Sequence, residues 1–135
     1  MKRVTIFTDG AAEPNPGPAA IGATIKDEQG RLITTISQGI GRATNNQAEY
    51  RAIIAALEKA IGLGAKQVDI SLDSELVVRQ INGEYRVKKA SLKPLCQQVK
   101  QLLSLLENFT ITHIPRQQNT EADNLANTAL DLAVD

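Results

Sequence analysis

The first third of the chain alternates apolar and polar side chains with a period of two residues. This period predicts a β-strand over residues 3–9, a second over 21–25 and a third over 32–40. The segment 13–18 is rich in proline and glycine and predicts a turn between the first two strands, and 27–30 predicts the next turn. Three successive strands joined by short turns are typical of an antiparallel meander.

The pattern changes to the helical period after residue 44. Alanine, isoleucine and leucine recur at intervals of three and four residues over 45–62, which predicts an amphipathic helix. Thr44 and Gln47 have the spacing of a capping box at its start. Gly62 and Gly64 predict its end, because glycine readily adopts the backbone conformation that follows a helix.

Helices and strands alternate in the rest of the chain. We expect a strand over 68–72, a short helix near 74–81, a helix capped by Ser91 that runs to about 107, a strand from Phe109 to Pro115, and a helix over 120–132. Strand–helix–strand steps give parallel strand pairs. The sequence therefore predicts an α/β fold with a mixed five-stranded sheet flanked by helices.

Composition limits the class of protein. The 135 residues are 42% hydrophobic and 22% charged, which indicates one folded domain over 1–135 and excludes a disordered chain. No apolar run is long enough to cross a membrane, and Asp9 follows the start too closely for a signal peptide. A single cysteine, Cys96, forms no internal disulfide, so we expect a protein of the reducing cytoplasm. Met1 and the complete set of elements favour a free-standing protein, which we expect to be a monomer. Cys96 and His113 cannot build a structural zinc site, so any metal would be held mainly by oxygens.

Charge is balanced overall but unevenly distributed. Fifteen basic and fifteen acidic residues cancel, so the net charge argues neither for nor against a nucleic-acid partner. Residues 79–100, however, contain six basic residues and only Glu84 as an acid. This segment is either a contact for a polyanion or a solvated helix face.

Four carboxylates stand at the borders of predicted elements. Asp9 ends the first strand and Asp73 the fourth, whereas Glu49 and Asp123 lie near helix starts, at the edge of the apolar stripe. Each alone could be a turn, cap or helix-dipole residue. Together at the rim of one core they would lose solvation and repel one another, and a hard divalent cation such as Mg²⁺ would relieve both effects. The sequence alone does not show that they converge.

Four motifs, in order along the chain, resemble those of the type 1 ribonuclease H family. They are Thr8-Asp9-Gly10-Ala11 with Asn15-Pro16-Gly17-Pro18, Thr44-Asn45-Asn46-Gln47-Ala48-Glu49, Leu72-Asp73-Ser74-Glu75, and Asn119-Thr120-Glu121-Ala122-Asp123-Asn124-Leu125-Ala126. The resemblance implies a ribonuclease H-like fold and hydrolysis of the RNA strand of RNA/DNA hybrids with two divalent ions, Mg²⁺ or Mn²⁺.

The resemblance also implies roles for individual residues. The metal-binding and catalytic carboxylates would be Asp9, Glu49, Asp73 and Asp123. The residues that contact the hybrid would be Gly10, Asn15, Asn45 and Asn46 near its minor groove, and Thr44 at a phosphate of the DNA strand. Asparagine amides suit this task because they can donate to and accept from a 2′-hydroxyl, the group that distinguishes RNA from DNA.

The chain differs from many family members in the segment that follows the predicted short helix near 74–81. The stretch 83–91 is too short for their basic protrusion, so Lys88 and the basic residues near it would take over part of that role. We therefore expect weaker hybrid binding with steep salt dependence. Tyr85 is the one aromatic residue near the place where relatives pack a ring against the DNA sugar; alternatively, it is a half-buried residue at a helix end.

The loop before the last motif differs as well. Relatives often carry a histidine there that assists product release, whereas His113 alternates in phase with Phe109 and Ile111 and is predicted to be a sheet residue. Arg116 lies closer to the expected place. Arginine does not shuttle protons near neutral pH but can hold a phosphate, so our hypothesis is that Arg116 assists catalysis electrostatically.

Other functions are compatible with parts of this pattern. A nuclease of the same fold could act on double-stranded RNA or branched DNA, and Asn45-Asn46 favours a reader of 2′-hydroxyls over a branched-DNA enzyme. A non-catalytic nucleic-acid-binding module is disfavoured, because a binder gains nothing from four acids that face phosphates. A fragment of a reverse transcriptase is a further alternative.

Overall fold

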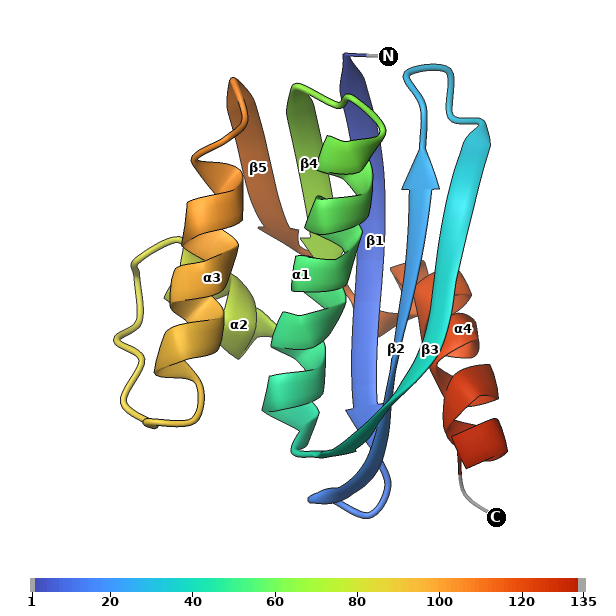
Figure 1. The fold of residues 1–135 in the computed structure, drawn as a ribbon, viewed down its shortest axis with the longest axis vertical. Coiled ribbons are helices and arrows are strands. Elements are labelled where there is room, and N and C mark those ends of the chain that lie inside the picture. The colour runs from blue at the N-terminus through green and yellow to red at the C-terminus, as the bar shows by residue number, and fades with distance from the viewer. Residues whose placement is uncertain (1, 134–135) are drawn as a thin grey trace.

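The computed structural model describes residues 2–133, which fold around one mixed five-stranded sheet (Figure 1). The strands are β1 (Arg3–Ala12), β2 (Gly17–Lys26), β3 (Leu32–Ala43), β4 (Gln67–Leu72) and β5 (Asn108–His113). Their spatial order is β3-β2-β1-β4-β5. The pairs β1–β2 and β2–β3 are antiparallel, whereas β1–β4 and β4–β5 are parallel. The predicted meander, mixed sheet and α/β class are therefore confirmed.

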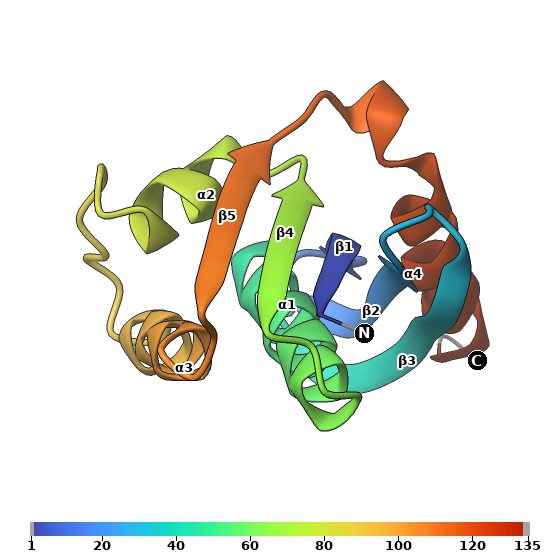
Figure 2. The same cartoon turned by 90° about the horizontal axis from the view of Figure 1, so that it is seen from above.

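Helices cover the two faces of this sheet. They are α1 (Asn45–Gly62), α2 (Glu75–Ile81), α3 (Lys93–Leu103) and α4 (Thr120–Ala133), with a single 3₁₀ turn, η1 (Arg116–Gln118), before α4. The view from above shows α1 and α3 on one face and α4 on the other, next to β2 and β3 (Figure 2). The short helix α2 packs against β5, α1 and α3. No helix within residues 2–133 is long and apolar enough to span a membrane.

The main core lies between the sheet and helices α1 and α3. Ile6, Ile25, Ile53, Leu57 and Ile70 are among its largest fully buried side chains. The sequence pattern predicts this core, because the apolar stripe of the 45–62 helix meets the apolar face of the strands. β2 is buried along nearly its whole length, since α1 packs on one of its faces and α4 on the other.

Two glycines let the helices approach the sheet closely on opposite faces. A β-carbon at Gly10 would overlap the backbone of Ala48 and Glu49 in α1, and one at Gly22 would overlap the backbone of Ala122 in α4. Gly22 pairs with Asp9 in the sheet. Neighbouring residues of a strand face opposite sides of the sheet. Gly10 therefore faces α1, whereas Asp9 and its partner Gly22 face α4, so the two helices contact the sheet on opposite sides of the same part of β1.

The boundaries of the helices hold within one residue, except for the start and end of the third helix. β2 and β3 are longer than predicted, because β2 begins at Gly17, within the predicted turn 13–18, and β3 continues to Ala43. The capping box of Thr44 and Gln47 is present, and Asn82 caps the end of α2. The prediction that Ser91 caps a helix to about 107 is wrong, because α3 begins at Lys93 after Leu92 and ends at Leu103. No side chain caps this start. Leu92 is buried instead, so apolar packing fixes the chain where the sequence suggested a polar cap.

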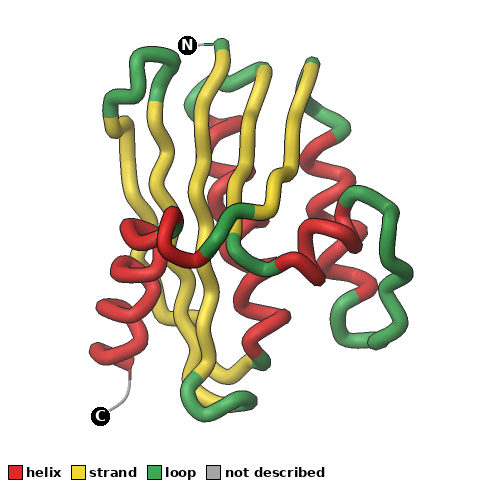
Figure 3. The backbone as a smooth tube through the Cα atoms, turned by 180° about the vertical axis from the view of Figure 1, so that it is seen from behind, coloured by secondary structure: helices red, strands yellow, loops and turns green. Residues whose placement is uncertain are grey.

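Two further differences lie beside the candidate site. β1 continues to Ala12, three residues beyond the predicted end, because β2 pairs with it as far as Ala19. The 3₁₀ turn η1 carries no periodic signal in the sequence. The backbone trace shows this turn crossing from the end of β5 to the start of α4 (Figure 3).

Candidate active site

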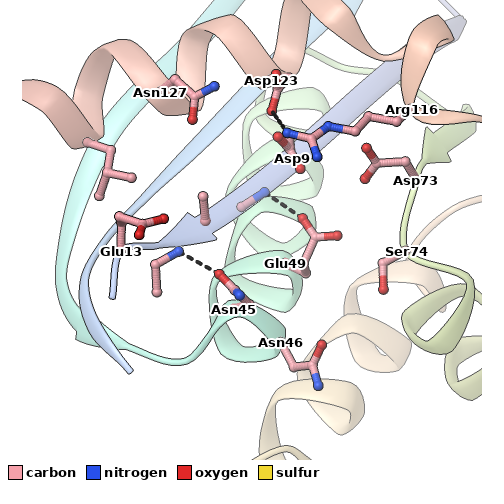
Figure 4. A pocket seen from close by; sticks show the side chains of 14 residues that line it. Asp9, Glu13, Asn45, Asn46, Glu49, Asp73, Ser74, Arg116, Asp123 and Asn127 are labelled. Atoms are coloured by element: carbon pink, nitrogen blue, oxygen red, sulfur yellow. Dashed lines mark hydrogen bonds and ion pairs between the residues drawn. The ribbon is translucent and has the colours of Figure 1, made fainter. Parts of the chain in front are cut away.

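Four acids that are distant in the sequence lie in one open pocket of about 520 Å³ (Figure 4). Asp9 comes from β1, Glu49 from α1, Asp73 from the residue directly after β4, and Asp123 from the first turn of α4. The pocket therefore forms where β4 ends and β1 continues, with one helix on each face of the sheet. The sequence named these four residues, and the fold brings them together.

The position of Glu49 follows from the backbone of β1. β4 pairs with β1 only as far as Phe7, so the edge of β1 beyond Phe7 is not covered by that strand. The backbone N–H of Gly10 donates to Glu49 Oε1 at 2.5 Å, and the N–H of Ala12 donates to Asn45 Oδ1 at 2.7 Å. Two side chains one helical turn apart on α1 therefore accept hydrogen bonds from two backbone N–H groups of β1. A longer β4 would have provided backbone acceptors for these N–H groups.

The start of α4 is tied to β1 by a residue to which we gave no role of its own from the sequence. Asn119 is 1% exposed, and its Nδ2 donates to the backbone carbonyl of Thr8 at 2.9 Å. The backbone carbonyl of Asn119 accepts the backbone N–H of Asp123 at 3.1 Å. Asn119 therefore fixes the helix that carries Asp123 against the strand that carries Asp9. No pattern in a single sequence marks this asparagine as buried.

The acids raise one another's pKa because they are buried and close together. Oxygens of Asp9, Glu49 and Asp73 all lie within 4.8 Å of one another, and Asp9 and Glu49 are each only 7% exposed. Burial, followed by the contact with Asp123, raises the pKa of Asp9 to about 7. Burial and then the charge of Asp9 raise the pKa of Glu49, and burial raises that of Asp73.

This donor set fits a hard divalent cation. Oxygen ligands from several carboxylates are the ligands that Mg²⁺ and Mn²⁺ take in proteins. A dication in the cluster would offset both the repulsion and the lost solvation that raise these pKa values. Asp123 is not part of the tight cluster of three, but it lines the same pocket on the side of Asp9.

Of the described residues that line the pocket, Arg116 alone is basic. It extends from η1 over the acids, and its Nη2 lies 3.9 Å from Asp123 Oδ1 (Figure 4). Its charge also opposes the rise in the pKa of Asp73. His113 ends β5 opposite Leu72, so its predicted place in the sheet is confirmed, and it does not line the pocket.

The residues expected to contact substrate divide into two groups at this pocket. Gly10, Asn45 and Asn46 line it, whereas Asn15 and Thr44 do not. Asn15 Oδ1 accepts the backbone N–H of Asn45 at 3.0 Å, and Thr44 Oγ1 accepts that of Gln47 at 3.1 Å. In this structure Asn15 and Thr44 hold the start of α1, the helix turn that presents Asn45 and Asn46.

Tyr85 and Lys88 lie in a second depression beside the pocket, which we call the basic groove. The groove has a volume of about 470 Å³ and is lined by Asn46, Leu76, Gln80, Glu84, Tyr85, Arg86, Lys88, Lys89 and Leu92. Tyr85 is 45% exposed, and the guanidinium of Arg79 lies 5.3 Å from the centre of its ring. Because Asn46 lines both the pocket and the groove, a ligand could extend from one into the other.

Six lining residues of the pocket had no site role in the sequence analysis. They are Ala11, Ala12, Glu13, Ser74, Asn127 and Leu130. Asn127 could have been found, because it follows Asp123 by one helical turn and must share its face of α4. The Ser74 hydroxyl accepts the backbone N–H of Val77 at 3.3 Å and caps the start of α2. This local role explains why a serine stands at this position.

Comparisons with known proteins agree with this architecture. A family model described as reverse transcriptase-like matches residues 7–129. The Ribonuclease HI of Halobacterium salinarum is 43% identical over 129 residues, which are 96% of this chain and 65% of that protein. The bifunctional protein Rv2228c of Mycobacterium tuberculosis is 42% identical over 132 residues, 97% of this chain and 36% of that protein. The chain thus spans only part of the length of both relatives.

A solved structure is similar along the whole fold. The crystal structure of LC11-RNase H1 in complex with an RNA/DNA hybrid has a TM-score of 0.92 and 42% sequence identity to this chain. The match covers 98% of this chain and 99% of that one.

Proposed function

This chain belongs to the type 1 ribonuclease H family, and on that premise we propose that it hydrolyses the RNA strand of RNA/DNA hybrids. The observation that carries the proposal is the cluster of Asp9, Glu49 and Asp73, with oxygens within 4.8 Å of one another in an open pocket. Buried acids without a basic partner among them are costly to a fold, and a metal-dependent reaction gives a reason to keep them.

Asp9, Glu49, Asp73 and Asp123 would hold the metal, which we propose to be Mg²⁺ or Mn²⁺ bound as two ions. Bound in that way, the ions would activate a water beside the scissile phosphate and stabilise the leaving oxygen. The chain itself supplies the rigid frame. The N–H of Gly10 holds Glu49, and Asn119 ties the helix start of Asp123 to β1. No side chain of the pocket has to act as the nucleophile.

The amides at the start of α1 would recognise the hybrid. Asn45 Oδ1 is already bound to the N–H of Ala12, so its orientation is set before substrate arrives. Asn46 lies between the pocket and the basic groove and can contact the strand pair where the two depressions meet. Contacts of this kind read the 2′-hydroxyl and the backbone, so we expect weak preference for base sequence.

Tyr85 and Lys88 would bind the uncleaved strand in the basic groove, and Arg116 would contact the phosphate at the acids. The groove supplies an exposed ring and the cations Arg86, Lys88 and Lys89. Arg116 is exposed and reaches the pocket from a single 3₁₀ turn, so it can turn from Asp123 toward a phosphate.

We also propose that the protein acts as a cytoplasmic monomer. Cys96 is a buried free thiol, which suits a reducing compartment. Sedimentation of the purified protein should give a mass close to 14.6 kDa.

The direct test offers the protein four labelled substrates, RNA/DNA, RNA/RNA, DNA/DNA and single-stranded RNA, with Mg²⁺, Mn²⁺ or a chelator. We expect cleavage of the RNA strand in the hybrid alone, and only with metal. Glu49→Gln is the matched blank, because its amide oxygen still accepts the N–H of Gly10 while a metal ligand is lost. Equal cleavage of double-stranded RNA would favour the broader nuclease, and hybrid binding without cleavage would favour a binding module.

A further inference from the structure

Gln80 is a buried amide at the base of the basic groove. It is 5% exposed, comes from the last turn of α2, and lines the groove beside Asn46 and Tyr85. Polar side chains this deeply buried normally have partners inside the protein. The contacts of its two polar atoms therefore show what Gln80 can do.

Only the oxygen of this amide has a partner among the described residues. Tyr50 Oη donates to Gln80 Oε1 at 2.7 Å, and both side chains are buried. A tyrosine hydroxyl is protonated at neutral pH, so Tyr50 is the donor and the Gln80 oxygen the acceptor in this contact. Within residues 2–133, Gln80 Nε2 has no hydrogen-bond acceptor, yet it is not among the fully buried atoms that lack one.

These contacts orient the amide. Because Oε1 faces Tyr50, Nε2 is directed away from it, and Gln80 lines both the basic groove and a neighbouring depression that Lys93 and Lys100 also line. Tyr50 follows Glu49 on α1, so the residue that fixes this donor is adjacent in the chain to a proposed metal ligand. The partner that orients Gln80 and the acid Glu49 thus lie on the same turn of α1.

We propose that Gln80, oriented by Tyr50, is a substrate-positioning residue that donates a hydrogen bond from Nε2 to the sugar-phosphate backbone of the uncleaved strand. This inference rests on the proposed function. The chemistry of the groove favours that ligand. Arg86, Lys88 and Lys89 attract phosphates, and the exposed sides of Leu76 and Tyr85 offer an apolar wall for a sugar. The long basic side chains can reach a phosphate in many positions, whereas a fixed neutral donor forms a hydrogen bond only with an acceptor in one position. Gln80 would therefore fix where the backbone of the strand lies.

Steady-state kinetics on an RNA/DNA hybrid in Mg²⁺ test the proposal. Gln80→Glu keeps an acceptor for Tyr50 and replaces the donor that faces the groove by an oxygen. We expect KM to rise about 10-fold or more with kcat nearly unchanged, because an acceptor then faces the backbone oxygens. Gln101→Glu is the matched control. It makes the same change of charge on an exposed residue of α3 that lines neither depression, and its KM should stay within about twofold.

A second variant separates positioning from a purely structural tie between α1 and α2. Tyr50→Phe with Gln80→Met replaces both partners by apolar groups of similar shape, which leaves no buried polar atom unpaired and should preserve the fold. We expect a thermal midpoint close to that of the parent protein and a KM raised about 3- to 10-fold. A parent-like KM in this folded variant would overturn the inference. If the unaltered protein fails to cleave the hybrid, the proposed function itself is wrong.

Discussion

Acidic side chains lie at both ends of the neighbouring strands β1 and β4, and their environments differ. Near the start of both strands, Asp69 accepts two hydrogen bonds from Arg3, at 2.7 and 3.0 Å, and one from Thr110 at 2.6 Å. These contacts, the one with Arg3 foremost, lower the pKa of Asp69. At the other end, Asp9 and Asp73 lie close together with Glu49, and the pKa of all three is raised.

The difference separates an acid that stabilises the fold from acids that the fold must tolerate. Asp69 is partly exposed and has a cation beside it, so its charge is compatible with folding in any solution. The three clustered acids have little solvent and no cation bound as closely, so their charges are stable together only when a cation is supplied from outside.

Asp9→Asn should have opposite effects on activity and on stability. Hybrid cleavage should fall by more than about 10³-fold, because a ligand at the centre of the cluster is lost. The thermal midpoint of the metal-free protein at pH 8 should rise, since one buried charge is removed. Cleavage assays and thermal denaturation in chelator measure the two effects. A variant that loses both activity and stability would contradict this account of the cluster.

Arg116→Ala should reduce turnover and leave the fold intact. The Arg116 side chain is exposed, and its one ion pair within residues 2–133 is with Asp123 at 3.9 Å, so we expect the fold not to depend on it. If it holds a phosphate during the reaction, kcat should fall about 10- to 100-fold, and Arg116→Lys should recover part of the loss. Full turnover in Arg116→Ala would exclude the electrostatic role.

The metal-free protein should lose stability as the pH rises from about 4 to about 7. An acid whose pKa is raised by folding binds its proton more tightly in the folded state, so stability is greatest below the unfolded pKa and falls as the pH passes the folded value. We expect the thermal midpoint to drop on the order of 5–10 °C over this range. Saturating Mg²⁺ should remove most of the drop, because it binds the ionised acids. A midpoint independent of both pH and Mg²⁺ would contradict the prediction.

Asp69→Asn should have the smallest effect and is the matched control for Asp73→Asn, because Asp73 directly follows the strand that carries Asp69. Its ion pair with Arg3 is exposed to solvent, so its loss should lower the thermal midpoint by only about 1–3 °C and leave cleavage unchanged. Asp73→Asn should abolish most cleavage. Similar activities in the two variants would remove the distinction between the two groups of acids.

Local signals in the sequence were sufficient wherever neighbouring residues decide the structure. Thr44 and Gln47 predicted the start of α1 correctly, because a capping box involves only two residues that are three apart in the chain. The prediction from Ser91 used the same kind of local signal and was wrong. It has the right type for a cap, but the burial of Leu92 against the core decided where α3 begins. The length of β1 also depended on a distant partner, Ala19 of β2.

The order of strands and helices and the identity of the four acids can be predicted from the amino-acid sequence, because periodicity and motif spacing are properties of the chain alone. That these acids share one pocket depends on the fold, since it requires the close approach of α1 at Gly10 and of α4 at Gly22. The same holds for Asn119 and Gln80. Their importance lies in the direction of a single amide, and that direction is fixed by atoms far away in the chain, Thr8 O and Tyr50 Oη.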